Sequence, residues 1–204
     1  MSIRLVLCDF DRTITKGDVL DRISALTGSC GASRLIDREY RNGMIDGIEA
    51  LQKRFALIKG LSVEEIERDV LSGIRLNKGA RKFFDFTEKV GVRSVVLSGN
   101  MNFVLHYFQN KLNFTEYYGS CVRTDNGIVG EFVPSEDNKN MVAEQLVAKG
   151  GYRTDEIVAI GDSIADMGFL RLAKYRFLMN SKPFGVDAIF VNSFDEIRKY
   201  IEQL

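Results

Sequence analysis

Two carboxylates stand directly after a short apolar segment near the start of the chain. Residues 3–8 are rich in β-forming side chains and are expected to form a buried strand, and Asp9 and Asp11 follow where that strand ends. In open α/β sheets, ligands bind at the carboxyl ends of the parallel strands. Acidic groups there are costly unless they hold a cation or take part in a reaction. Taken alone, the Asp-x-Asp pattern fits a polar strand exit equally well, so the other motifs must decide.

Further polar side chains follow later apolar segments. Ser98 follows one such segment, and Asp162 and Asp166 follow another. Lys139 stands where a helix is expected to begin. Because the strand ends of a right-handed parallel sheet can share one edge, we expect these groups to lie together. Carboxylates beside a hydroxyl and an ammonium group form a hard oxygen site, which suits Mg²⁺ better than zinc, for which the sequence has no His and Cys cluster. We therefore predict Mg²⁺ as the cofactor.

The elements that must position these groups alternate along the chain. After the first strand and a long helical stretch, β-type runs occupy residues 92–97, 117–122, 157–160, 177–179 and 188–191. Helical patterns fill the intervals at residues 80–90, 101–112, 138–149 and 196–204. Residues 125–127 read Asp-Asn-Gly, which indicates a hairpin turn. The alternation predicts an α/β fold, a doubly wound parallel sheet with a Rossmann-like core.

The long helical stretch contains four apolar stripes with no strand between them. They lie around residues 19–26, 35–40, 48–58 and 62–71. Ser62 is the expected N-cap of the fourth helix, with Glu65 at its third helical position. We predict two domains, a core made of residues 1–15 and 78–204 and a small helical cap made of residues 16–77, inserted after the first strand.

The polar motifs occur in the order and the approximate spacing found in one known family. They are Asp9-x-Asp11-x-Thr13, Ser98-Gly99, Lys139 and Gly161-Asp162-Ser163-x-x-Asp166. In this set the chain resembles the haloacid dehalogenase-like phosphatases, and the resemblance spans nearly the whole sequence. The helical insert is similar to the cap of the phosphoserine phosphatase branch. The resemblance implies an aspartyl nucleophile, a Mg²⁺ ion and a cap that closes over the substrate.

The resemblance implies a role for each acidic residue of the motifs. Asp9 would attack phosphorus and become an aspartyl-phosphate. Asp11 would protonate the leaving alkoxide and then deprotonate the attacking water. Asp9, the backbone carbonyl of Asp11, and Asp162 would hold Mg²⁺. Asp166 is included among the residues of the metal site, where it would orient Lys139 or a metal-bound water.

The remaining motif residues would bind the phosphoryl group. The resemblance implies that Lys139 and the Ser98 hydroxyl hold the transferring oxygens, assisted by backbone N–H groups near Gly99. Thr13 would fix the loop that follows the nucleophile by hydrogen bonding. Catalysis is thus expected from Asp9, Asp11, Ser98 and Lys139 together.

The substrate would be selected in the cap. In the phosphoserine phosphatase branch an acid contacts the substrate amine and a cap arginine contacts its carboxylate, and Asp18 and Arg54 stand at these places. We predict a phosphoserine phosphatase that forms serine, as in serine biosynthesis. The chain departs from the branch where Arg41 and Gly47 replace apolar cap residues and Ala165 replaces an Asn.

Other interpretations stay open at this point. Arg54 could equally be an exposed helical cation. A methionine-salvage phosphatase acting on a keto-enol phosphate, or a broad-specificity phosphatase of small metabolites, would carry the same motifs. A phosphoacceptor signalling module also places an Asp, Mg²⁺, a hydroxyl and a Lys together, but it lacks a helical insert and needs no acid at Asp11. Continuous turnover would separate an enzyme from such a module.

The composition limits the classes of binding partner that we expect. The 204 residues carry a formal net charge of +0 with scattered basic residues, so we expect neither nucleic acid nor a membrane surface as a partner. The expected partner is a small phosphorylated metabolite, and the oligomeric state is left open. Cys8, Cys30 and Cys121 have neither metal-type spacing nor a disulfide pattern. Together with an N-terminus that does not read as a signal peptide, this predicts a cytoplasmic protein.

Overall fold

A mostly parallel sheet forms the centre of the fold. The computed structural model describes residues 3–135 and 137–204. Within them the sheet has seven strands in the order β4-β3-β2-β1-β5-β6-β7, and every neighbouring pair is parallel except β3 and β4. The strands are β1 (Leu5–Asp9), β2 (Arg93–Met101), β3 (Glu116–Asp125), β4 (Ile128–Val133), β5 (Ile157–Gly161), β6 (Tyr175–Met179) and β7 (Ile189–Val191). The predicted α/β fold with a parallel, Rossmann-like sheet is confirmed.

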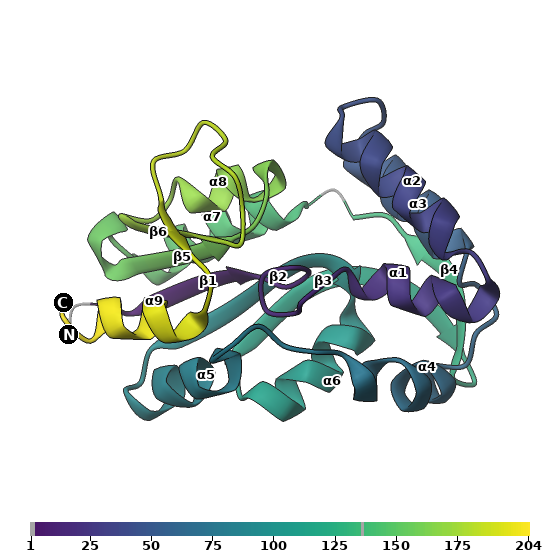
Figure 1. The fold of residues 1–204 in the computed structure, drawn as a ribbon, viewed down its shortest axis with the longest axis horizontal. Coiled ribbons are helices and arrows are strands. Elements are labelled where there is room, and N and C mark those ends of the chain that lie inside the picture. The colour runs from purple at the N-terminus through teal and green to yellow at the C-terminus, as the bar shows by residue number, and fades with distance from the viewer. Residues whose placement is uncertain (1–2, 136) are drawn as a thin grey trace.

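Helices cover both faces of this sheet (Figure 1). They are α5 (Ala80–Lys89), α6 (Asn102–Leu112) and α9 (Phe194–Ile201) on one face, and α7 (Lys139–Gly150) and α8 (Met167–Leu170) on the other. The central strand β1 supplies both cores, because successive side chains of a strand point to opposite faces. Val6 and Cys8 pack with the phenylalanines of α5 and α9, and Leu5 and Leu7 pack with α7 and α8. Such burial on both faces explains the unbroken apolar run in the sequence.

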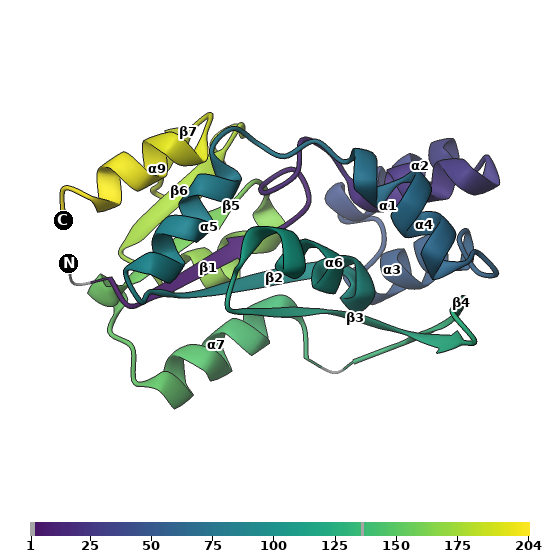
Figure 2. The same ribbon diagram turned by 90° about the horizontal axis from the view of Figure 1, so that it is seen from below.

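Four helices form the insert between β1 and α5. They are α1 (Val19–Ser24), α2 (Cys30–Arg41), α3 (Gly47–Ala56) and α4 (Val63–Asp69), close to the predicted stripes. Asp18, Asp46 and Ser62 cap three of them by accepting a hydrogen bond from a backbone N–H in the first turn. The insert leaves and rejoins the sheet at one place, where Thr15 and Leu76 form an antiparallel bridge. The two connections are therefore paired, and the insert lies beyond the carboxyl end of β1 (Figure 2).

The hairpin of β3 and β4 reaches out from the sheet and supports the insert. Three backbone hydrogen bonds of 2.8–2.9 Å join the hairpin to the segment that connects α3 and α4. Two of them link the loop of this segment to Val129, and the third runs from Val63, the first residue of α4, to Gly127. The rings of Phe55 on α3 and Phe132 on β4 also pack with their centroids 5.3 Å apart. The predicted Asp-Asn-Gly turn thus forms, and it holds the insert at a point far from its two connections.

The structure differs from the sequence-based prediction in two places near the site. Strand β2 continues to Met101 rather than ending at Leu97, with a shift in its register against β3 between these residues. Such an irregularity redirects side chains at the edge of a sheet. The short helix α8 was not predicted, since four residues are too few for a periodic pattern. Among the described residues, no helix combines the length and the apolar character that a membrane span requires.

Candidate active site

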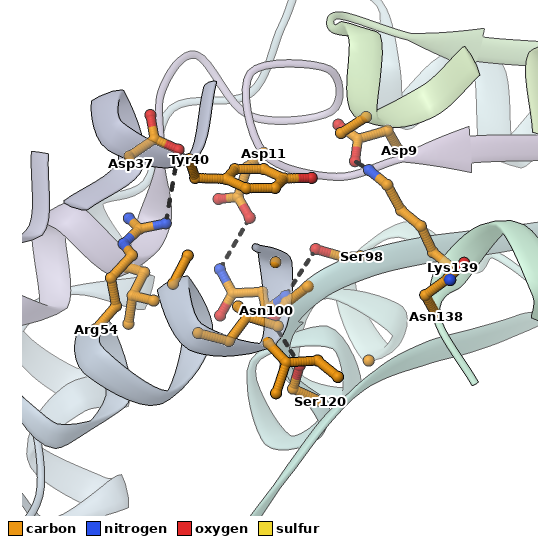
Figure 3. Close-up of a pocket in the computed structure, with 18 of the residues that line it drawn as sticks. Asp9, Asp11, Asp37, Tyr40, Arg54, Ser98, Asn100, Ser120, Asn138 and Lys139 are labelled. Carbon is orange, nitrogen blue, oxygen red and sulfur yellow. Dashed lines mark hydrogen bonds and ion pairs between the residues drawn. The ribbon is translucent and has the colours of Figure 1, made fainter. Parts of the chain in front are cut away.

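The carboxyl ends of β1, β2 and β5 open into one cavity beneath the helical insert. Its volume is about 650 Å³, and α2 and α3 of the insert contribute to its wall. The sequence-predicted residues that line it are Asp9, Asp11, Asp18, Arg54, Ser98, Gly99, Lys139 and Asp162. Figure 3 shows Asp9 with Lys139 on one side of this cavity and Arg54 with Asp37 on the other. Neighbouring strands of a parallel sheet bring these distant sequence positions together, as the strand-end argument predicted.

Asp9 is held in place by two side chains. Its Oδ1 accepts a hydrogen bond of 2.9 Å from Lys139 Nζ, and its Oδ2 accepts one of 2.9 Å from the Thr13 hydroxyl. The residue is only 5% exposed. Burial is the main cause that raises its pKa to about 6, and the nearby Asp166 adds to the effect, while Lys139 opposes it. Asp9 is thus an oriented and buried carboxylate in the wall of the cavity.

Asp11 contacts the insert and β2 rather than Asp9. Its Oδ1 accepts a hydrogen bond of 2.7 Å from the backbone N–H of Val19, and its Oδ2 accepts one of 3.0 Å from the Asn100 amide. Burial, with the charge of Asp18 next, raises the pKa of Asp11 to about 7. A carboxyl group that titrates near neutral pH can both give and take a proton, which is what a general acid and base must do.

Three carboxylates form a cluster that could hold a cation. Oxygen atoms of Asp9, Asp162 and Asp166 lie within 4.8 Å of one another. Burial and the charges of Asp9 and Asp166 raise the pKa of Asp162 to about 8, and Lys139 is paired with Asp9 and Asp166 rather than with Asp162. Asp166 is fully buried, and its oxygens accept hydrogen bonds from Lys139 and from the backbone N–H groups of Asp162 and Ser163. Oxygen donors of this kind fit a hard divalent cation, with Asp9 and Asp162 as the more accessible ligands.

Lys139 and Ser98 add donors beside Asp9. Lys139 opens α7 after the N-cap Asn138, and its ion pairs with Asp166 and Asp9 outweigh its burial and raise its pKa, so it stays protonated. Ser98 Oγ accepts a hydrogen bond of 3.0 Å from the Asn100 N–H, which leaves the hydroxyl proton available to a ligand. Gly99 lies directly below α3, since a Cβ there would come within 3.3 Å of Leu51. The irregular end of β2 thus presents the Ser98 hydroxyl and the backbone of Gly99 to the cavity.

Arg54 and Asp18 lie together, bound to each other. Arg54 is 7% exposed, so the alternative interpretation as an exposed helical cation is wrong. Its Nη2 donates to Asp18 and Asp21 at 2.6 and 3.0 Å, and its Nε donates to Ser33 at 3.0 Å. Burial alone would raise the pKa of Asp18, but the Arg54 charge lowers it overall. Two of the three nitrogen atoms of the guanidinium are therefore engaged inside the insert.

Sequence reasoning assigned no role to several residues that shape the cavity. Arg12 adopts a left-handed backbone conformation with φ of 64° and pairs with Asp37 at 2.9 Å and with Asp18 at 3.5 Å. Arg41, on the last turn of α2, also pairs with Asp37, at 3.0 Å. The ring of Tyr40 projects into the space between Arg54 and Asp9 (Figure 3). Arg12 could have been identified from the sequence, because it directly follows Asp11. Asp37 could not, because its contacts depend on how α2 packs.

The fold and the site define an α/β protein with an oriented aspartate, a paired lysine and a carboxylate cluster at the carboxyl edge of its sheet. Residues 6–171 match the family model of the haloacid dehalogenase-like hydrolases. The chain belongs to this family, and the resemblance found in its four motifs is confirmed.

Curated relatives match most of this chain. A phosphoserine phosphatase of Methanocaldococcus jannaschii is 24% identical over 208 residues, which cover 98% of each protein. A phosphoserine phosphatase of Archaeoglobus fulgidus is 28% identical over 185 residues, which cover 88% of this chain. The chain spans about half of that second relative, 53% of its length.

Solved structures support the same fold. A phospho-aspartyl intermediate analogue of a phosphoserine phosphatase superposes with a TM-score of 0.83 at 24% identity, covering 97% of this chain and 98% of the other. A substrate-bound phosphoserine phosphatase complex gives a TM-score of 0.83 at 22% identity with the same coverage. At this level of identity the likeness concerns the arrangement of the whole backbone, including the helical insert.

Proposed function

We propose that the protein is a Mg²⁺-dependent phosphomonoester phosphatase that acts through an aspartyl-phosphate, with phosphoserine as its substrate. The observation that carries the proposal is the placement of Asp9, which Lys139 and Thr13 orient at 2.9 Å each beside the Asp162 carboxylate. The family, the phosphoserine phosphatases among its relatives and the cavity above Asp9 support the same activity.

Residues 16–77 act in this proposal as a cap domain over a core of residues 1–15 and 78–204. The paired connections at Thr15 and Leu76 and the wall that α2 and α3 give to the cavity support this division. A cap over the site excludes water that would compete with the leaving group and with phosphate oxygens for hydrogen bonds.

The first step transfers the phosphoryl group to the protein. An Asp9 oxygen forms a bond to phosphorus while the bond from phosphorus to the ester oxygen breaks. Protonated Asp11 gives its proton to the departing alkoxide, which leaves as the alcohol. The ammonium of Lys139 and the hydroxyl of Ser98 hold oxygens of the transferring group, and Thr13 keeps the Asp9 carboxylate in position.

The second step regenerates the carboxylate. Asp11, now ionised, takes a proton from a water molecule as that water attacks phosphorus, and the bond from phosphorus to the Asp9 oxygen breaks. Inorganic phosphate and the starting form of the enzyme result. Mg²⁺, held by Asp9, Asp162 and the Asp11 carbonyl, would offset the negative charge of carboxylates and phosphate that crowd the site. Asp166 orients Lys139 in both steps.

Release of inorganic phosphate from a panel of metabolite phosphates with Mg²⁺ tests this function. We expect continuous turnover, with phosphoserine preferred over p-nitrophenyl phosphate and over a keto-enol sugar phosphate. A preference for the keto-enol phosphate would favour the methionine-salvage activity, and similar rates on all members would favour a broad-specificity phosphatase. Stoichiometric phosphorylation without release would mean a phosphoacceptor module and would contradict the proposal.

Replacing Asp11 by Asn should slow hydrolysis according to the leaving group. Loss of a general acid typically costs on the order of 10²–10⁴-fold, and alkoxides need the proton most. We expect a loss of this size in kcat for phosphoserine, but a loss of less than about tenfold in the burst of nitrophenolate from p-nitrophenyl phosphate. Equal losses in both measurements would show that Asp11 does not protonate the leaving group.

The crowded carboxylates should make the metal-free protein less stable as the pH rises. The pKa values of Asp9 and Asp162, about 6 and about 8, exceed that of an unfolded aspartate, about 4. Between pH 4 and 8 the folded state therefore binds more protons than the unfolded state, so its stability falls with rising pH. We expect a lower Tm at pH 8 than at pH 5 without metal, and a larger increase from Mg²⁺ at pH 8.

Asp162→Asn serves as the comparison for this stability measurement. The variant removes one of the repelling charges, so its metal-free Tm should fall less between pH 5 and 8, and Mg²⁺ should raise it little. If Mg²⁺ raised the Tm of both proteins equally at the two pH values, the cluster would not be the cation site.

A further inference from the structure

Among the described residues, Arg41, like Arg12, forms hydrogen bonds through only one of its guanidinium nitrogen atoms, and its side chain is the more exposed of the two, 37% against 32%. Within the part of the chain that the structure describes, Nε of Arg41 donates to Asp37 at 3.0 Å, while Nη2 lies 3.9 Å from Asp162 Oδ2, which is too long for a hydrogen bond. The side chain is 37% exposed and lines the cavity that contains Asp9. Its outer edge can therefore receive a ligand without breaking a buried contact.

Arg54, by contrast, is unsuited to bidentate binding of an anion. Its Nη2 and Nε bind Asp18, Asp21 and Ser33, and Nη1 alone is left, 4.0 Å from Asp37. A bidentate contact needs two neighbouring nitrogen atoms of the fork. Freeing them would break the short hydrogen bonds from Arg54 to two buried carboxylates, which is costly.

The position of Arg41 relative to Asp9 defines where a second charged group would lie. Asp162 lies 3.9 Å from Arg41, and its carboxylate lies within 4.8 Å of that of Asp9. The guanidinium is thus within the length of a small phosphorylated acid from the nucleophile. The cavity of about 650 Å³ could hold about twenty water molecules at about 30 Å³ each, so it has room beyond a phosphate group.

Gly47 and Tyr40 line the part of the cavity next to α2. A Cβ at Gly47 would lie 3.5 Å from Cε2 of Tyr40, which is an ordinary van der Waals contact, so Gly47 lies directly beside the ring. The Tyr40 ring extends from α2 into the space in front of Arg54 (Figure 3). Tyr40 and Arg41, at the end of α2, line the same cavity as Asp9, so a ligand on Asp9 can extend toward Arg41.

We propose that Arg41 determines substrate specificity by binding a second anionic group, a carboxylate or a second phosphate, of the phosphomonoester whose phosphate lies on Asp9. The inference rests on the proposed phosphatase activity and specifies its substrate class. If phosphoserine is the substrate, Arg41 rather than Arg54 binds its carboxylate.

Matched substrate pairs test this role directly. Phosphoserine and phosphoethanolamine differ only in the carboxylate, and fructose 1,6-bisphosphate and fructose 6-phosphate differ in a second phosphate. A charge-assisted hydrogen bond contributes enough for about a tenfold to hundredfold change. We expect Arg41→Ala to lower kcat/KM by this factor for the anionic member of the preferred pair, and by less than about threefold for the other member. Which pair responds identifies the anion.

Control variants separate specificity from support of the cap. Arg38 lies on the same last turn of α2, is exposed and does not line the cavity, so Arg38→Ala should leave both members unchanged. Arg41→Lys keeps the charge and should recover only part of the preference, because Lys lacks the fork. Arg54→Ala should slow both members of a pair alike, since it removes the hydrogen bonds that hold two buried carboxylates of the insert.

Binding to the Asp9→Asn protein keeps the test independent of turnover. In calorimetry with Mg²⁺, this variant should bind phosphoserine or the bisphosphate at least tenfold more tightly than its partner, and adding Arg41→Ala should remove the difference. Absence of hydrolysis by the wild-type protein would overturn the proposed function, while the binding preference would still support Arg41. Equal slowing of both members by Arg41→Ala, no preference in binding, or a selective effect of Arg54→Ala or Arg12→Ala would overturn the role of Arg41.

Discussion

The Asp9→Asn protein is expected to fold normally and to lose turnover on the order of 10⁴-fold or more, a loss typical of removing a nucleophile. The amide is nearly isosteric with the carboxylate, but it cannot attack phosphorus. Thr13 can still donate to the amide oxygen, and Lys139 keeps its contact with Asp166. The change also removes a charge from a crowded carboxylate cluster, so we expect an equal or higher Tm.

Phosphate release and thermal unfolding of the same preparation check this result. Asp85→Asn is a suitable control, because Asp85 is an exposed acid on α5, outside the cavity. If Asp9→Asn retained more than about a tenth of the wild-type rate on phosphoserine, the nucleophile would have to be sought elsewhere. A variant that lost both activity and cooperative unfolding would call for Asp9→Glu, which should fold and remain inactive because its carboxylate is displaced.

Removing divalent cations should stop turnover reversibly. Asp9, Asp162 and the incoming phosphate all carry negative charge in a buried site, where like charges repel strongly. Compensation of this charge is expected to contribute several kcal/mol, about a thousandfold in rate. EDTA should therefore abolish activity, and Mg²⁺ should restore it. Asp162→Asn should raise the Mg²⁺ concentration needed for half-maximal activity. It should also lower the rate by about a thousandfold, the same factor as above.

The matched control for the metal prediction is Asp155→Asn. Asp155 is a half-buried acid that is paired with Arg153 and absent from the cavity wall. Its variant should keep the wild-type dependence on Mg²⁺. Full activity after rigorous chelation would remove the cation from the reaction, and unchanged Mg²⁺ dependence of Asp162→Asn would remove Asp162 from the cation site.

The sequence predicted the parts of the site that depend on local pattern. Residues 3–8 could be recognised as a strand because they are apolar and β-forming, and a strand of this kind fixes Asp9 at its carboxyl end. Ser62 could be recognised as an N-cap because capping uses contacts within one turn. The motif residues Asp9, Ser98, Lys139 and Asp162 then converge because neighbouring parallel strands end at the same edge.

Contacts between distant segments could not be predicted in this way. Arg54 pairs with Asp18 and Asp21, more than thirty residues away, because α2 packs against both α1 and α3, and no periodic pattern encodes that packing. The hydrogen bond from Asn100 to Asp11 likewise depends on the register shift in β2. For this reason the sequence placed an arginine in the cap but could not show that its own neighbours already bind it.

Trapping the covalent intermediate shows directly whether Asp9 is the nucleophile. The enzyme is mixed with radiolabelled phosphoserine and Mg²⁺, quenched in acid within the first turnovers, digested and mapped by mass spectrometry. We expect acid-stable, base-labile phosphate on the peptide that contains Asp9, and none on the Asp9→Asn protein. Phosphate on a different residue, such as Ser98, or steady hydrolysis with no labelled protein at any quench time, would contradict this expectation.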